Sequence, residues 1–283
     1  MADAAKLAFQ ISLFVVILGY GLTARYSDVT CVLRLPDLLA RSLLAVLVVA
    51  PVIAAVLVSV LALRPQVAIA LVALAITPLP SLLPRRGAKA GGHVQYGLGL
   101  VVVLAVLAVP WTAAATPLLG QVFGSQYVVS TWHIAGLVVT SVLAPLVAGM
   151  TIRSRRPELA ERIAGPVERV QRWALPVAII MLVMAAAPAM WKLMGGWTLV
   201  AVVLFVTTMV AIGHVLGGPD PRFSAVLAFA ASCRHPATAL TFAAANFPNA
   251  DERGAVALYV LVTAAIGVLY TRWLRRRSVK LAS

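Results

Sequence analysis

The chain has 283 residues, of which 62% are hydrophobic and only 11% are charged, and its mean hydropathy is +0.98. Soluble domains are about half apolar and about a quarter charged, so this composition excludes a water-soluble fold. The net charge of +14 does not indicate a nucleic-acid partner, because most Lys and Arg residues stand in short connectors between apolar blocks, as membrane topology requires.

Apolar blocks recur along the whole chain, each of roughly twenty residues, the length with which a helix crosses about 30 Å of hydrocarbon. In chain order we predict membrane-spanning helices at residues 7–24, 42–63, 66–84, 93–118, 129–151, 173–191, 197–217, 224–247 and 254–272. The first block has no convincing small-residue cleavage site after it, so we interpret it as a retained helix and not a signal peptide. The sequence thus predicts a single all-α membrane domain of about nine helices, embedded in the lipid bilayer.

Basic residues divide unequally between the two sides that these spans define. The connectors on one side carry 18 of the 23 Lys and Arg residues, those on the other side carry 4, and Arg234 lies inside a span. Because cytoplasmic connectors collect positive charge, we expect an outside N-terminus and a cytoplasmic C-terminus in the plasma (inner) membrane. The longest charged connector, residues 152–171, fits either a short amphipathic helix on the inner surface or a plain linker.

Two spans contain residues that are unusual in a membrane helix. The third span holds Thr77, Pro78, Pro80, Ser81 and Pro84, and the eighth holds Ser232, Cys233, Arg234, His235, Pro236 and Thr238. Proline removes a backbone donor and clashes with the preceding turn, so we expect both helices to be interrupted. The two spans run in opposite directions, and interrupted spans in corresponding places of two inverted halves point to the substrate site of a transporter. On this interpretation spans one to four pair with spans six to nine, giving repeats at about 7–118 and 129–275.

Arg234 is the most informative residue of the chain. A guanidinium near the bilayer centre is costly and usually faces a cavity or pathway, and every Asp and Glu of this sequence falls at an end or in a connector. Pro236 can begin a new half-helix, whose N-terminal amides would add partial positive charge beside Arg234. This arrangement favours an anionic ligand, and the alternative role for Arg234 is to cap carbonyls of the broken helix.

The other candidate substrate-binding residues are Ser232, His235, Thr238, Thr241, Thr77 and Ser81, all in the two unusual spans. His235 is also a candidate proton carrier, because histidine changes charge near neutral pH, but a neutral histidine that satisfies loose backbone fits equally. Small packing roles remain open for Ser232 and Cys233, and helix back-bonding remains open for Thr238, Thr241 and Asn246. The only cysteines, Cys31 and Cys233, do not form a metal or disulfide pattern, so we expect no metal and no cofactor.

The chain resembles the bile acid:sodium symporter family. The likeness runs through residues 19–23 (GYGLT), 33–36 (LRLP), 91–93 (GGH), 116–119 (TPLL) and 232–237 (SCRHPA). The resemblance implies two inverted five-helix repeats, whose fourth and ninth helices are broken and cross at the substrate site. Some members lack the first helix of the ten, and nine spans with an outside N-terminus correspond to that shortened form.

The sequence departs from this family at the residues that concern sodium. Members that couple to sodium carry Glu-x-Gly-x-Gln-Asn at the second crossing, where the matching residues here are Ala230, Ser232, Arg234 and His235. A hard cation prefers several oxygen ligands that include a carboxylate, so this sequence argues against sodium coupling. Proton coupling through His235, facilitated diffusion and anion exchange all remain open.

The leading hypothesis from the sequence is alternating-access transport of a small organic anion around Arg234. An intramembrane enzyme is a weaker alternative, because Cys233 and His235, two residues apart, match no nucleophile and base pattern well. A sensor or binding protein that kept the fold and lost transport is a second alternative. The sequence alone does not separate that protein from a carrier.

Overall fold

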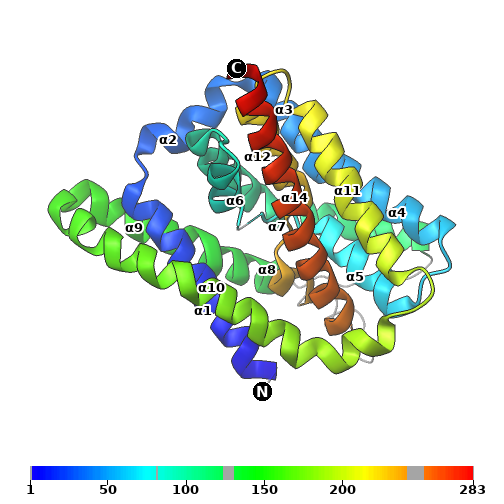
Figure 1. The fold of residues 1–283 in the computed structure, drawn as a ribbon. Helices are drawn as coiled ribbons and strands as arrows, with labels where there is room; N and C mark the ends of the chain where they lie inside the picture. Colours follow the sequence, from blue (N-terminus) through cyan, green and yellow to red (C-terminus); the bar gives the residue numbers. More distant parts are fainter. Residues whose placement is uncertain (1, 81, 124–130, 241–251, 283) are drawn as a thin grey trace.

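A computed structural model describes residues 2–80, 82–123, 131–240 and 252–282, and all of the secondary structure in these residues is helical (Figure 1). Where the structure describes them, the spans expected from the sequence coincide with helices or with consecutive helical segments, apart from non-helical residues at 77–80 and 233–235. Within the described residues, five helices are long and apolar enough to cross a membrane, or six if a pair bent by 104° at residues 24–25 counts as one. The expected all-helical membrane architecture is therefore confirmed in five or six apolar helices of the described residues, and the expected count of nine spans is not confirmed.

The first half of the chain forms α1 (Ala2–Thr23), α2 (Tyr26–Thr30), the 3-10 turn η1 (Cys31–Arg34), α3 (Pro36–Leu43), the π-helical turn η2 (Leu44–Val49), α4 (Ala50–Val60), α5 (Pro65–Ile76), α6 (Leu83–Lys89) and α7 (Val94–Phe123). The second half forms α8 (Thr131–Val138), the π-helical turn η3 (Val139–Leu143), α9 (Ala144–Arg155), α10 (Pro157–Leu193), α11 (Thr198–Leu216), α12 (Pro221–Ser232) and α14 (Arg253–Ala282). A further helical stretch begins at Pro236.

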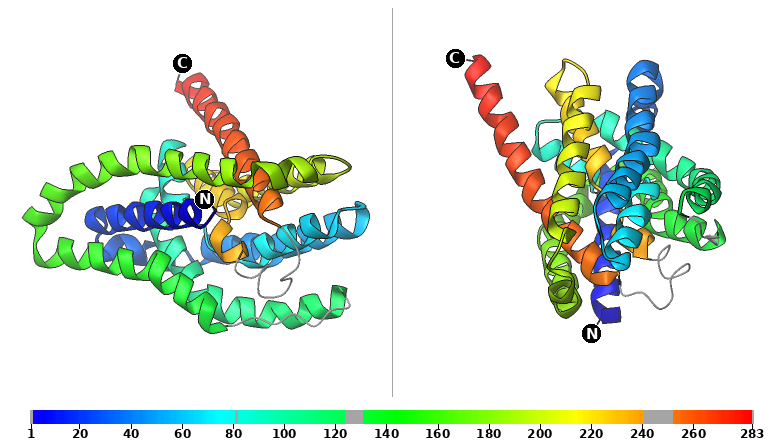
Figure 2. Two further views of the ribbon diagram at one scale, coloured as in Figure 1. Left: turned by 90° about the horizontal axis from the view of Figure 1, so that it is seen from below. Right: turned by 90° about the vertical axis from the view of Figure 1, so that its right-hand side faces the viewer.

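Three helices, α1, α9 and α10, form a layer of their own, with α1 between the other two (Figure 2). The α1 and α10 helices run antiparallel, because Ser12 donates to the Ala174 carbonyl and Gln171 donates to the Val15 carbonyl. Against α9, a Cβ added at Gly149 would lie 2.6 Å from the Leu18 carbonyl, so only glycine allows this close approach. We refer to α1, α9 and α10 as the three-helix layer.

The remaining helices share a larger apolar core. This core joins residues of α3 to α7 with residues of α11, α12 and α14, and it also includes Val138 of α8, Val142 of η3 and Leu193 of α10, while small apolar clusters lie between α1 and its neighbours. The α14 helix also packs against α10, which joins the larger unit to the three-helix layer. The molecule thus contains two packing units, and the two broken helices belong to the larger one.

The basic connectors gather at two ends of the molecule. At one end Arg275 donates to the Lys89 carbonyl at 2.6 Å, and the Arg222 carbonyl accepts from the backbone N–H of His93 at 3.2 Å. At the other end Arg64 donates to the Lys192 carbonyl. Connectors that the charge pattern assigns to the same side therefore meet in space.

Residues 157–171 do not form a separate amphipathic helix or a linker. They are the first part of α10, which continues through Pro166, Pro176 and Pro188 to Leu193 and is separated from α9 only at Arg156. Each isolated proline costs a helix one hydrogen bond, and packing of α10 against α1 and α14 compensates this loss.

Candidate functional site

The first break lies between α5 and α6, where residues 77–80 and Leu82 adopt no helical structure. Pro78 lacks the N–H that would bond the Leu74 carbonyl if the helix continued. The hydroxyl of Thr77 takes this place, since it donates to the Ala73 carbonyl at 2.9 Å and to the Leu74 carbonyl at 3.3 Å. Thr77 thus replaces, from within the same segment, the donor that Pro78 removes.

The second break lies at Cys233, Arg234 and His235, between α12 and the helix that begins at Pro236. Pro236 lacks the N–H that would bond the Ser232 carbonyl, and the hydroxyl of Tyr259 on α14 donates to that carbonyl instead. The same hydroxyl accepts a hydrogen bond from the backbone N–H of Arg234 at 2.8 Å. A side chain from another helix thus holds this break open.

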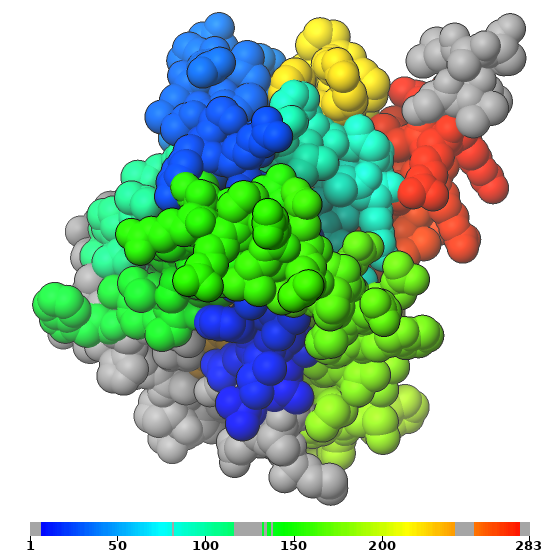
Figure 3. All heavy atoms as spheres, turned by 90° about the vertical axis from the view of Figure 1, so that its left-hand side faces the viewer, coloured from blue at the N-terminus to red at the C-terminus, as the bar shows by residue number. Residues whose placement is uncertain are grey.

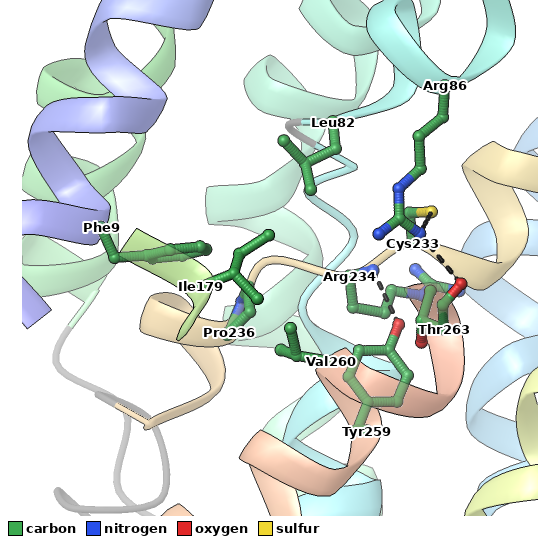
Figure 4. A pocket seen from close by; sticks show the side chains of 10 residues that line it. All are labelled: Phe9, Leu82, Arg86, Ile179, Cys233, Arg234, Pro236, Tyr259, Val260 and Thr263. Carbon is green, nitrogen blue, oxygen red and sulfur yellow. Dashed lines mark hydrogen bonds between the residues drawn. The ribbon is translucent and has the colours of Figure 1, made fainter. Parts of the chain in front are cut away.

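The two breaks meet at a small cavity (Figure 4). Its lining residues come from both breaks, from α14 and from the three-helix layer: Phe9, Leu82, Arg86, Ile179, Cys233, Arg234, Pro236, Tyr259, Val260 and Thr263. The cavity has a volume of about 20 Å³. One water molecule needs about 10–15 Å³. In this conformation the cavity accommodates water but not an organic solute, so binding of a solute requires it to widen.

Arg234 is only 4% exposed and is one of the residues that line this site. One amino group, Nη2, donates to the Val46 carbonyl at 3.1 Å. That carbonyl has no donor from its own helix. In the turn η2 the N–H of Ala50 bonds the Ala45 carbonyl, and the next residue, Pro51, has no N–H. Nε and Nη1 of Arg234 are buried and have no hydrogen-bond partner among the described residues. Arg234 therefore both caps a carbonyl, in another helix, and keeps two donors for a ligand.

His235 lies at the second break but does not line the cavity. It is 1% exposed, and its Nδ1 accepts from the backbone N–H of Thr238 at 3.2 Å, which caps the helix that begins at Pro236. His93 makes the same contact with the backbone N–H of Tyr96 at the start of α7. The sequence left two roles open for His235, that of a proton carrier and that of a neutral partner for free backbone groups. The hydrogen bond from the Thr238 N–H corresponds to the second role.

The remaining candidates that lie in the described part of the chain do not line the cavity. The hydroxyl of Thr77 bonds within α5, that of Ser232 donates to the Ala228 carbonyl at 2.7 Å, and that of Thr238 bonds His235 Nδ1 at 3.1 Å. Ser81, Thr241 and Asn246 lie outside the described residues. Of the candidates that can be placed, Arg234 alone lines the cavity.

Sequence reasoning missed Arg86, Tyr259 and Thr263. Arg86 was assigned to a connector, but it is half-buried on α6, and its Nη1 contacts Cys233 Sγ at 3.2 Å and the Thr263 carbonyl at 3.1 Å (Figure 4). Tyr259 and Thr263 are polar residues one turn apart in an apolar stretch of α14. Their spacing places them on one face of the helix, and a polar face in an apolar helix is the sequence signal for this side of the site.

A wider crevice lies between α6 and the three-helix layer, with a volume of about 580 Å³. Its charged residues are Arg85, Lys89, Glu168 and Arg172. Partial burial, and then repulsion from Arg85, Arg86 and Arg275, hold the pKa of Lys89 below its ordinary value. On the face seen in Figure 3, the green surface of α9 and α10 borders the turquoise region that contains α6. The crevice is electropositive and favours anions.

Two comparisons with known proteins bear on this site. The model of the Sodium Bile acid symporter family matches residues 10–212, which include the first break but end before the second. No curated protein matches the chain.

Proposed function

This chain belongs to the sodium bile acid symporter family, a family of membrane transporters, and we propose that it carries a small organic anion by alternating access without sodium coupling. The substrate binds at the junction of the two breaks, with Arg234 as its anchor. The observation that carries this proposal is the pair of buried donors, Nε and Nη1 of Arg234, that have no partner among the described residues.

Charge supports an anionic substrate. A buried guanidinium without a counter-charge is costly, and the described residues that line the cavity include no carboxylate. An anion that enters the cavity supplies the missing charge and hydrogen-bonds the two donors of Arg234. Binding then repays the desolvation of the anion.

The same charges argue against a sodium ion at this junction. Arg86 and Arg234 repel a cation, and among the described lining residues Tyr259 and Thr263 alone carry a side-chain oxygen. Sodium prefers several oxygen ligands, including a carboxylate. Proton coupling through His235, facilitated diffusion and anion exchange remain the candidate modes.

Two structural units support an alternating-access mechanism. The cavity lies where the larger unit meets Phe9 of α1 and Ile179 of α10, and the crevice of about 580 Å³ lies at the same interface near the basic end. Movement of the larger unit against the three-helix layer would widen the cavity and open it to one side at a time. The crevice then serves as the access route from the basic end.

The membrane arrangement that we propose has nine spans in two inverted repeats, at about 7–118 and 129–275. The antiparallel packing of α1 on α10 and the neighbouring positions of the two breaks support it. The basic end, where Lys89, Arg222 and Arg275 gather, faces the cytoplasm of a plasma (inner) membrane. The N-terminus is then outside.

Uptake of labelled carboxylates and sulfonates into proteoliposomes tests this function. We expect uptake of at least one organic anion, with a rate that a sodium gradient does not change, and a parallel series with a pH gradient distinguishes proton coupling from diffusion and exchange. Strong stimulation by sodium contradicts the coupling proposal. Absence of uptake for every anion, with specific binding retained, instead favours a sensor on the same fold.

A further inference from the structure

Arg86 brings a second guanidinium to the cavity between the breaks. It lies on the half-helix that follows the first break, and its Nη1 contacts Cys233 Sγ at 3.2 Å. Cys233 directly precedes Arg234 in the second break. Each broken segment therefore contributes one cation to the same small space (Figure 4).

The described surroundings of this space do not balance two positive charges. The three ion pairs found in the described part of the chain join Arg153 to Glu161, Arg172 to Glu168 and Arg222 to Asp220, and none of them involves Arg86 or Arg234. A ligand with one negative charge leaves one guanidinium without a counter-charge in a medium of low dielectric constant. A ligand with two negative charges neutralises both.

Both cations also retain donors for such a ligand. Arg234 has Nε and Nη1 without partners, and for Arg86 the hydrogen bonds found among the described residues all come from Nη1. The two guanidiniums are covered differently, since Arg234 is buried whereas Arg86 is half-buried. Arg86 is therefore the more accessible of the two cations.

The crevice leads a dianion along the same helix. On α6, Arg85 and Lys89 line the crevice while Arg86 lines the cavity, so successive positions of one helix present positive charge from the outer space to the inner one. Positive charge along a route raises the local concentration of a dianion more than that of a monoanion.

We propose that the substrate is a short dianion, such as a dicarboxylate, and that Arg86 is the residue that selects it over monoanions. This inference rests on the function proposed above and adds the substrate class. Arg234 binds one acidic group and Arg86 binds the other.

Cys233 provides a built-in probe for this test, because it lies in the cavity and Cys31 is the only other cysteine. In a Cys31→Ser background, the reconstituted protein is reacted with N-ethylmaleimide in the presence of malonate, succinate or glutarate, or of the matched monocarboxylates propionate and butyrate. The quantity measured is the concentration of each acid that halves the rate at which Cys233 is alkylated. These concentrations are compared between acids within one variant, so an effect of Arg86 on the reactivity of the thiol cancels.

We expect a dicarboxylate to protect Cys233 at concentrations at least about tenfold lower than the matched monocarboxylate, since losing one buried charge partner has an effect of this size or larger. Arg86→Gln should abolish this difference while protection by monocarboxylates persists, and Arg86→Lys should keep part of it. Equal protection by both classes, or a difference that survives in Arg86→Gln, overturns the dianion proposal but leaves anion transport standing. Absence of protection by any acid overturns both.

Discussion

The two broken helices solve the same backbone problem in different ways. At the first break Pro78 removes the donor for the Leu74 carbonyl, and Thr77 of the same segment replaces it. At the second break Pro236 removes the donor for the Ser232 carbonyl, and Tyr259 of α14 replaces it. The first break is self-contained, whereas the second depends on a neighbouring helix.

The difference extends to charge. Residues 77–80 and Leu82 at the first break include no charged residue, while the second carries Arg234, which also bonds the Val46 carbonyl of the π-helical turn η2. The second break is thus tied to two other helices through groups that lie at the proposed site. We infer that residues 77–80 mainly shape the site, whereas the second break itself supplies a binding residue, Arg234.

The largest effect is expected for Arg234→Met, which removes the charge and keeps much of the volume. Transport should fall at least about 30-fold, the equivalent of about 2 kcal/mol, because the anion then loses its charged partner. The melting temperature in detergent should change little, since the lost bond to the Val46 carbonyl opposes the relief of burying a charge.

A matched control is Arg169→Gln, which removes an exposed arginine of α10. We expect uptake by this variant to equal that of the wild type. If Arg234→Met transports normally, the second break does not supply the anion anchor and the comparison fails.

Tyr259→Phe should have the next largest effect. This change removes the hydroxyl that donates to the Ser232 carbonyl and accepts from the Arg234 N–H. Both buried backbone groups then lose this hydrogen-bond partner. The expected loss of stability is about 1–3 kcal/mol, measured by thermal or denaturant unfolding, with a matching drop in transport. Tyr26→Phe, at a residue that is 63% exposed, should change neither property.

His235 allows capping and proton transfer to be distinguished. If its role is to accept from the Thr238 N–H, His235→Asn should preserve stability and the pH profile of transport, while His235→Ala should cost about 1 kcal/mol. A pH profile that becomes flat in His235→Asn, with stability retained, would instead identify His235 as the proton carrier.

The smallest effect is expected at the first break. Thr77→Val removes the hydroxyl that bonds the Ala73 and Leu74 carbonyls and should cost about 1 kcal/mol of stability, with little change in transport. Thr77→Ser, which keeps the hydroxyl, should restore stability. A loss of transport in Thr77→Val that matches the loss in Tyr259→Phe would remove the distinction between the breaks.

The breaks were predictable from the sequence because their prolines have other helix-breaking or polar residues beside them. Pro78, Pro80 and Pro84 lie close together, and Pro236 follows a polar stretch, so no single neighbouring contact restores a continuous helix. The single prolines of α10 leave that helix unbroken, and Pro51 is accommodated by the π-helical turn η2. A proline alone therefore does not identify a break, whereas neighbouring prolines or a preceding polar stretch do.

The contents of the site were less predictable. Arg234 was identified because a charge inside an apolar span is conspicuous, and it does line the cavity. Arg86 was missed because it lies beside Arg85 and Lys89 in what looks like a cytoplasmic connector, and only the fold shows that successive residues of α6 face different spaces. Hydroxyls such as that of Ser232 were overvalued, since they bond the backbone of their own helix.

The most direct test of the account is an experimental structure of the wild-type protein with a transported carboxylate bound. We predict a carboxylate oxygen within about 2.7–2.9 Å of Nε or Nη1 of Arg234, between the two breaks, with the cavity widened around it. A carboxylate held only in the outer crevice, or at a place that Arg234 does not reach, would contradict the account.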